Sequence, residues 1–261
     1  MQTTFSFYRL GLLIRKQWAE RARLYILMMA AIAGLLAVAF FLWGSFRDDN
    51  TLLIEPLQVF LFVGLFLGGC IIAGMTFSDL SQRTTGIYYL GVPATHAEKL
   101  VCGILFSQVF FNAAYLLIFY LLREIAFVIV AMNPHLQLKH IPDAGNIGEI
   151  SYYVIIVYAA VQTVYLLGSV YFERFAFVKT TVSVVLLLAA FTLFAQYVIA
   201  RIMPQNHSIM GVGVFQVEEN GGWYTYTLPL GLSRVLWFLG RYMWAPVFWA
   251  VAYFRLKEKE I

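Results

Sequence analysis

The sequence predicts an all-α integral membrane protein. It would form one domain (residues 1–261) of six transmembrane helices, with an N-terminal interfacial amphipathic helix and a small exterior β-hairpin before the last span. Three observations support this fold class. Of the 261 residues, 61% are hydrophobic and only 12% are charged, whereas about 25% charged is usual in soluble domains. The apolar residues gather in runs of about 20, which a helix needs to cross a hydrocarbon core about 30 Å thick. Short clusters of Lys and Arg flank these runs.

The N-terminal region is expected to contain two elements. Residues 4–20 place Phe5, Tyr8 and Leu12 at helical spacing among basic residues, which is typical of an amphipathic helix lying in the membrane interface. The alternative is that these residues are only the charged start of the first span. The apolar run at 24–43 is long for the hydrophobic core of a signal peptide, so it is predicted to be the first span.

The remaining spans follow from the other apolar runs. They are expected at 57–75, 100–122, 150–172, 181–202 and 235–254. In the second span, Gly64 and Gly68 stand four residues apart and form a stripe on which another helix can pack closely. Arg241 and Pro246 interrupt the last span, so its outer portion can form a separate re-entrant or interfacial helix.

The segment 203–234 is expected on the exterior. Within it, β-rich runs at 212–217 and 223–227 flank the sequence EENGG at 218–222, which is a hairpin signature. The sequence therefore predicts a small ordered cap before the last span.

The basic residues predict the orientation, because Lys and Arg concentrate in short cytoplasmic segments. With the N-terminus inside, 12 of the 18 basic residues fall on the cytoplasmic side. These are Arg9, Arg15, Lys16, Arg21, Arg23, Arg83, Lys99, Arg174, Lys179, Arg255, Lys257 and Lys259. Six spans with both termini in the cytoplasm are the expected topology.

No catalytic site and no metal site are predicted. The four His residues show no HExxH or equivalent ligand spacing. Cys70 and Cys102 belong to no CxxC pair, which disfavours a zinc site and a disulfide framework. No Asp, Glu or His stands at mid-span, which argues against a proton-relay transporter. A P-loop motif is absent, so no cofactor is expected on this chain. The net charge of +4 reflects residues flanking the spans, so no nucleic-acid partner is expected.

Amide side chains are the main polar groups within the spans. Gln58, Gln108, Asn112, Gln162 and Gln196 are candidates for lining a substrate path. The alternative interpretation is that they form hydrogen bonds between helices, each contributing about 0.6 to 2 kcal/mol.

The longest polar-leaning stretch on the expected cytoplasmic side is 76–99. Its start, Ser78-Asp79-Leu80, can cap and begin a short helix that continues to Arg83. Gly86 is expected to break the chain direction, and Pro93 precedes a helix that leads into the third span. This layout is typical of a lever that transmits a force into the membrane. The alternative is a loop that merely joins two spans.

At these residues the chain resembles a known family. The run YYLGVPATHAEKLVCG at 88–103 and the loop GSVYFERFAFVKT at 168–180 are similar to permease subunits of type-2 ATP-binding-cassette (ABC) exporters, in particular the small permeases of Bacteroidetes-type bacteria. The sequence departs from the family at Thr95-His96-Ala97, where a basic residue is usual, so that Lys99 is the nearest cation.

The resemblance implies a multi-pass protein of the bacterial inner membrane, working as a dimer with a second permease copy or a related permease. Two cytoplasmic ABC ATPase subunits would carry ATP and Mg, and would press on the 76–99 segment to switch the bundle between inward- and outward-facing states. The residues implied in that contact are Ser78, Asp79, Leu80, Gln82 and Arg83.

Two rival hypotheses come from other classes. A membrane scaffold or assembly protein without a transport path would use the glycine stripe of the second span and the exterior hairpin to bind other membrane proteins. A membrane enzyme acting on lipid would need groups such as Glu124 or Arg201, but the sequence contains no catalytic constellation around them.

Overall fold

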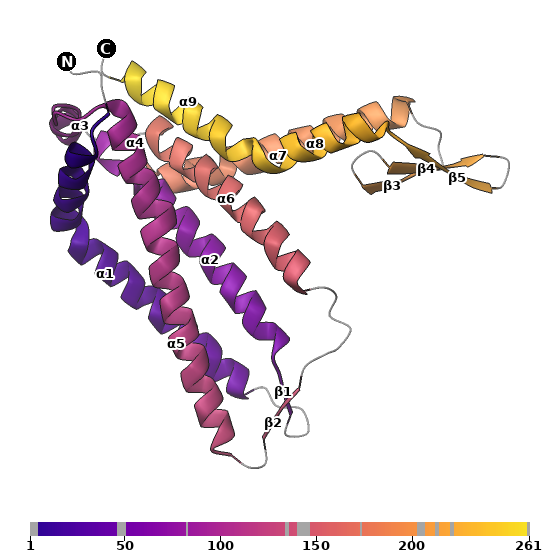
Figure 1. Cartoon of the computed structure of the whole chain (residues 1–261), viewed down its shortest axis with the longest axis horizontal. Coiled ribbons are helices and arrows are strands. Elements are labelled where there is room, and N and C mark those ends of the chain that lie inside the picture. The colour runs from indigo at the N-terminus through magenta and orange to yellow at the C-terminus, as the bar shows by residue number, and fades with distance from the viewer. Residues whose placement is uncertain are drawn as a thin grey trace.

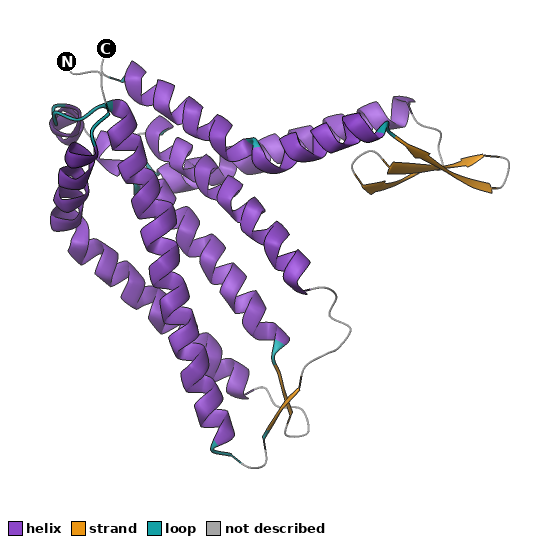
Figure 2. Cartoon of the chain, viewed as in Figure 1, coloured by secondary structure: helices purple, strands orange, loops and turns teal. Residues whose placement is uncertain are grey.

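The computed structural model describes residues 5–45, 51–81, 83–133, 136–139, 147–172, 174–202, 207–211, 214–219 and 222–259. The α-helices in chain order are α1 (Phe7–Ser45), α2 (Glu55–Met75), α3 (Arg83–Leu90), α4 (His96–Ile104), α5 (Phe111–Ala131), α6 (Ile147–Tyr171), α7 (Ala176–Ile202), α8 (Leu230–Tyr242) and α9 (Trp244–Glu258). Helices dominate the chain, as Figure 2 shows. α1 begins and α9 ends at the same end of the bundle, called the near end below, whereas α5 ends at the opposite far end (Figure 1).

A single helix of 39 residues, α1, replaces the two elements expected at 4–20 and 24–43. The residues between them, Arg21 to Arg23, are Arg-Ala-Arg. Neither Pro nor Gly stands there, and Arg and Ala are among the best helix formers. The N-terminal amphipathic stretch therefore continues directly into the apolar stretch without a break.

The central helix, α2, packs against α1, α5, α6 and α7. Pro56 lies in its first turn. Proline lacks an N–H, but an N–H at this position has no acceptor within the helix, so no hydrogen bond is lost. Its glycines allow close approach, because a Cβ on Gly64 would clash with the Tyr115 hydroxyl and a Cβ on Gly68 would lie 2.9 Å from the Phe111 ring. The glycine stripe is thus covered by the chain's own helices.

The third membrane helix is longer than the expected 100–122. α4, a π-helix at Leu105–Phe110 and α5 form one stretch from His96 to Ala131. It extends past position 122 because the residues up to Ala131 are apolar apart from Arg123 and Glu124, and contain no breaker. It begins earlier because residues 96–99 form the first turn of α4.

The next two helices, α6 and α7, lie close to the expected 150–172 and 181–202. The turn between them places Phe175 at φ 53°, a left-handed conformation that is unfavourable for a bulky residue. Just beside this turn the two helices cross tightly, since a Cβ on Gly168 would clash with Thr180. Farther along the chain α7 separates from α6, as Figure 1 shows.

The last expected span, 235–254, is a bent pair. α8 and α9 meet at Met243 with an angle of 51°. Pro246 lies in the first turn of α9, where it lacks the N–H that would continue a helix from α8. The interruption expected at Arg241 and Pro246 is therefore present, and α8 is a separate helix.

Two small sheets complete the described chain. β1 (Thr51–Leu53) and β2 (Gln137–Lys139) pair in parallel. β3 (His207–Gly211), β4 (Val214–Glu219) and β5 (Gly222–Thr227) form an antiparallel sheet in that order. The sequence predicts a hairpin of two strands within 203–234, and the structure has a third strand, β3. Residues 203–206, 212–213 and 220–221 of that segment lie outside the described residues.

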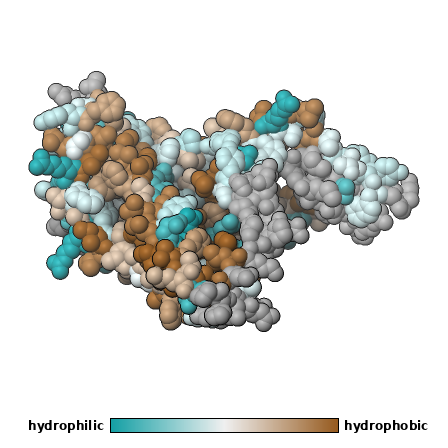
Figure 3. All heavy atoms as spheres, turned by 60° about the horizontal axis from the view of Figure 1, so that its bottom comes forward, coloured by the Kyte–Doolittle hydropathy of each residue, from teal (hydrophilic) through white to brown (hydrophobic). Residues whose placement is uncertain are grey.

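The surface of the helices is apolar. Within the described residues, five helical stretches are long and apolar enough to cross a membrane: Phe7–Ser45, Glu55–Met75, His96–Ala131, Ser151–Tyr171 and Ala176–Arg201. Large apolar side chains such as Phe191 and Leu193 of α7 are exposed, and Figure 3 shows apolar residues over much of the visible helical face. Exposed apolar surface of this extent is foreign to soluble monomers. The chain is a multi-pass membrane protein. If the bent pair of α8 and α9 is counted as one span, the described residues contain six spans.

Candidate functional site

The 76–99 segment lies at the near end of the bundle, where Figure 1 places α3 and the start of α4. It consists of a 3₁₀-helix at Ser78–Ser81, then α3, then a turn that leads to Thr95. The break expected at Gly86 is not found there, because Gly86 lies inside α3. The change of direction comes at Gly91 to Ala94 instead, where Pro93 ends the helical pattern.

Two apolar side chains anchor the segment in the bundle. Phe77 is 1% exposed and Leu80 is buried as well. They pack in one cluster with residues from three helices: Leu100 of α4, Leu166 and Val170 of α6, and Ala252 and Leu256 of α9. The ring of Phe77 sits so close to Gly103 that a Cβ there would lie 2.7 Å from it. Displacement of the segment would therefore act directly on the near ends of α4, α6 and α9.

Arg21 joins α1 to the beginning of the segment. Its Nη1 donates to the carbonyl oxygens of Met75 at 3.2 Å and Thr76 at 3.1 Å, which end α2. Its Nη2 forms an ion pair with Asp79 at 2.5 Å and donates to Ser78 Oγ at 3.3 Å. A cation is favourable at this position, because the last carbonyls of a helix carry partial negative charge.

Glu98 joins α1 to the end of the segment. Its side chain is fully buried and its Oε1 accepts from Ser6 N–H at 2.7 Å and pairs with Arg9 at 3.1 Å. Its Oε2 accepts from Thr95 N–H at 2.8 Å, and Thr95 Oγ1 accepts in turn from Glu98 N–H at 3.2 Å. This reciprocal pair is a capping box. Thr95 is thus the residue that caps the N-terminus of α4.

Aromatic rings of α3 face two lysines. Lys16 of α1 lies 4.4 Å from the centre of the Tyr88 ring, and Lys99 lies 5.8 Å from that of Tyr89. Burial raises the pKa of the Tyr89 phenol, so this ring stays neutral beside the lysine. With Arg9 and Arg21, Lys16 completes three contacts of α1 with the segment.

The predicted contact residues occupy different environments. Ser78 is exposed, Asp79 is partly exposed in its ion pair, and Leu80 is buried. Arg83 is the first residue of α3, and Gln82 lies outside the described residues. Leu80 therefore serves as an anchor, not as part of an accessible surface.

Sequence reasoning missed the most exposed apolar pair of the segment. Ile87 is 74% exposed and Tyr88 is 66% exposed, on the outer side of α3. It also missed the contacts of Arg9, Lys16 and Arg21, which depend on how the N-terminal part of α1 packs beside the segment. The available signal was the apolar run from Ile87 to Leu90, of which these two residues are the first half.

The five amides of the spans are not gathered in one place. Buried Gln162 donates to the Ser107 carbonyl at 3.1 Å, and Asn112 Oδ1 accepts from the Tyr158 hydroxyl at 2.5 Å. Gln108 lies in the π-helix beside Ser107, and its Nε2 is buried without a hydrogen-bond partner in the described part of the chain. Gln58 of α2 is half-buried and Gln196 of α7 is exposed. Gln162 and Asn112 thus form hydrogen bonds between helices.

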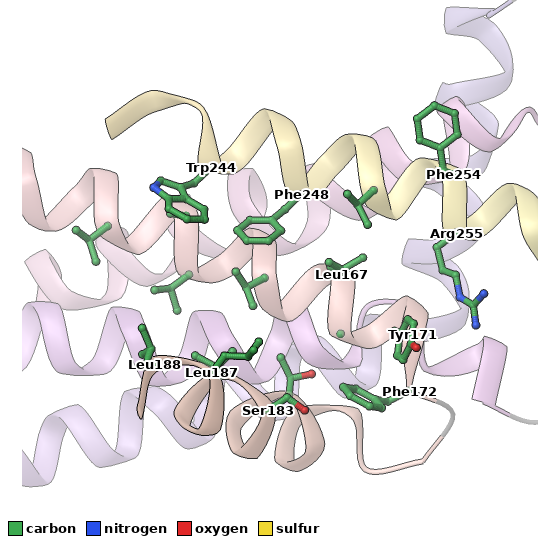
Figure 4. Close-up of a pocket in the computed structure, with 18 of the residues that line it drawn as sticks. Leu167, Tyr171, Phe172, Ser183, Leu187, Leu188, Trp244, Phe248, Phe254 and Arg255 are labelled. Carbon is green, nitrogen blue, oxygen red and sulfur yellow. The ribbon is translucent and has the colours of Figure 1, made fainter. Parts of the chain in front are cut away.

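A large groove lies between α6, α7 and α9, with a volume of about 880 Å³. Figure 4 shows Trp244 and Phe248 of α9 on one side and Leu187 and Leu188 of α7 on the other. None of the five amides lines it. The lining is mainly apolar, with the charged side chains of Arg241, Arg255 and Glu258 among it, and it differs from the path expected from the amides.

The residues that the structure describes contain no group of three or more His, Cys, Asp or Glu side chains that could hold a metal ion. Cys70 and Cys102 are buried and unpaired with each other. No protein-family model, curated protein or solved structure matches this chain.

Proposed function

We propose that this chain is the permease subunit of an ATP-driven type-2 ABC exporter in the bacterial inner membrane, with the near end in the cytoplasm. The observation that carries the proposal is the construction of the 76–99 segment. It presents Ile87 and Tyr88 to the outside, while Phe77 and Leu80 are packed into three helices. An exposed apolar pair at such a place is typical of a docking surface.

The proposed mechanism is mechanical. Two ABC ATPase subunits hold ATP and Mg, and their closure presses on Ile87, Tyr88 and the partly exposed Asp79. The buried anchors Phe77 and Leu80 pass the displacement to α6 and α9. Rigid helices that move against one another then switch the bundle between two states. A second copy of this chain or a related permease completes the transporter.

The features named for the rival hypotheses, apart from the exterior hairpin, make contacts within the chain. The glycine stripe that a scaffold protein would use is covered by Tyr115 and Phe111 of the same chain. Glu124, named for a lipid enzyme, pairs with its neighbour Arg123 at 2.6 Å, and Arg201 lies 5.5 Å from the ring of Tyr197.

The proposal predicts that an ABC ATPase subunit is the partner of this chain, and the test looks for that subunit. Wild-type protein is expected to co-isolate with it and to stimulate its ATPase activity in nanodiscs. The double variant Ile87→Asp with Tyr88→Asp should lower both by about tenfold, because an interface loses its apolar centre. Met132→Asp, an equally exposed apolar position at the far end, should leave both unchanged. Absence of co-isolation with the wild type would refute the proposal.

A further inference from the structure

The groove between α6, α7 and α9 has a defined shape. α6 and α7 cross tightly at Gly168 and Thr180 near one end and separate beyond it. α9 forms the third wall with Trp244 and Phe248, opposite Leu187 (Figure 4). The volume of about 880 Å³ lies within the range of ligand sites. An apolar occupant of substantial size fits between the three helices.

An arginine with an unsatisfied N–H lines the groove toward the far end. The guanidinium carbon of Arg241 lies 4.3 Å from the ring centre of Tyr153, 4.6 Å from Tyr152 and 5.7 Å from Trp237. Its Nε is buried and has no hydrogen-bond partner, and no carboxylate pairs with it among the described residues. The rings stabilise the cation through their faces, but they supply no negative charge.

A second arginine lines the near end of the same groove. Arg255 lies 4.9 Å from the ring centre of Tyr171, and its Nη1 bonds to Glu258 at 2.7 Å. Its Nε, like that of Arg241, is buried without a hydrogen-bond partner among the described residues, so the two arginines differ in the carboxylate. The charge of Arg255 is thus already compensated, and Glu258 itself lines the groove and would repel an anion. Charge therefore favours an anion at Arg241 and disfavours one at Arg255.

The surroundings of Arg241 resemble a membrane interface. Tyr153 and Tyr171 are separated along α6 by about 27 Å, close to the hydrocarbon thickness of about 30 Å. Tyr and Trp side chains gather at both boundaries of a membrane, as they do around Arg241. α8, which ends next to Arg241, is bent by 51° from α9 and exposes Leu236 and Phe238, as an interfacial helix would. Arg241 then stands at the level of lipid phosphates.

We infer that the groove binds an anionic membrane phospholipid, with its phosphate at Arg241 and an acyl chain between α6, α7 and α9. A guanidinium bonds phosphate oxygens through a planar fork, which suits the Nε–H of Arg241. A helix of a second copy could fill the apolar part of the groove, but it would leave Arg241 without an anion. This site goes beyond the proposed export function and does not depend on it.

The test compares lipids on the purified chain. Wild-type protein is placed in phosphatidylcholine nanodiscs with and without a minority of phosphatidylglycerol, and bound lipid is measured by native mass spectrometry after release. Phosphatidylglycerol should be retained about tenfold more than phosphatidylcholine, the change expected from one charge-assisted contact. Arg241→Gln should abolish this preference and Arg241→Lys should retain part of it, whereas the matched control Arg255→Gln should keep it.

Further measurements distinguish a bound lipid from a free anion or a second copy of the chain. Ala160→Trp fills the groove and should remove the bound lipid while Arg241 stays intact. Protection from heat by inorganic phosphate equal to that by phosphatidylglycerol would show a free anion site and overturn the inference. The inference is also overturned if the wild type shows no lipid preference, or if Ala160→Trp dissociates a dimer without changing lipid retention. No ATPase subunit takes part, so failure here is distinct from failure of the exporter proposal.

Discussion

Arg21 of α1 and Asp79 of the 76–99 segment form an ion pair with 2.5 Å between Nη2 and Oδ2. The same guanidinium also bonds the carbonyls that end α2. One side chain thus connects the first helix, the end of the second helix and the start of the segment that is proposed to receive force from the ATPase. The relative position of these three elements depends on this contact.

The first prediction concerns Asp79→Asn. The side chain of Asp79 is partly exposed, so loss of the ion pair should cost only about 0 to 1 kcal/mol of stability. Its effect on the proposed coupling should be larger, because one of the contacts that hold the segment to α1 would be weakened. We expect ATPase activity in the reconstituted complex to continue while its stimulation by substrate falls several-fold. Asp79→Glu is the control and should retain coupling. Normal coupling in Asp79→Asn would contradict the role assigned to the pair.

The second prediction concerns Glu98→Ala. This substitution removes the acceptors of Ser6 and Thr95 N–H and the ion pair between Glu98 and Arg9. Because Glu98 is buried, we expect a loss of about 2 to 4 kcal/mol in the free energy of unfolding, measured by thermal or denaturant unfolding in detergent. Glu258→Ala removes an exposed pair with Arg255 and should cost less than about 1 kcal/mol. Equal losses in the two variants would be inconsistent with the buried network.

The third prediction is a double-mutant cycle at the contact between α2 and α5. Gly64→Ala should destabilise the protein by about 1 to 3 kcal/mol, because its Cβ meets the Tyr115 hydroxyl. Tyr115→Phe alone should cost about 1 kcal/mol, because that hydroxyl donates to the Leu61 carbonyl at 2.9 Å. Combined, the two changes should cost less than their sum, because the clashing oxygen is gone. Gly34→Ala, where nothing lies within 4 Å, is the control and should be neutral or stabilising. Strict additivity would argue against the contact.

The helical membrane fold was predictable because it depends on local properties. Apolar runs near Leu57 and Val182 are long enough to span a bilayer, and the bilayer requires their backbone bonds to close within each helix. The break near Pro246 was predictable for the same reason, since proline lacks an N–H whatever surrounds it. The boundary expected between residues 20 and 24 was wrong, because a change from polar to apolar side chains does not interrupt a run of good helix formers.

The site was only partly predictable. The 76–99 segment stands out in the sequence by its polarity, but the roles of its residues depend on packing. Leu80, expected in a contact surface, is an anchor, whereas Ile87 and Tyr88 are exposed. Likewise, the glycines of α2 indicate a close helix contact without identifying Tyr115 and Phe111 as the partners.

The sequence by itself thus determined that the protein lies in a membrane, where its helices approximately begin and end, and where the polar 76–99 segment lies. These properties follow from composition and periodicity, which act within each stretch of chain. Only the tertiary structure decided which basic side chains contact the 76–99 segment. Arg9 pairs with Glu98 and Arg21 pairs with Asp79 because the N-terminal part of α1 packs beside the segment and α4. The groove between α6, α7 and α9 also arises from tertiary structure, because a tight crossing at Gly168 makes two helices diverge. Such contacts join residues far apart in the chain, and no local pattern contains them.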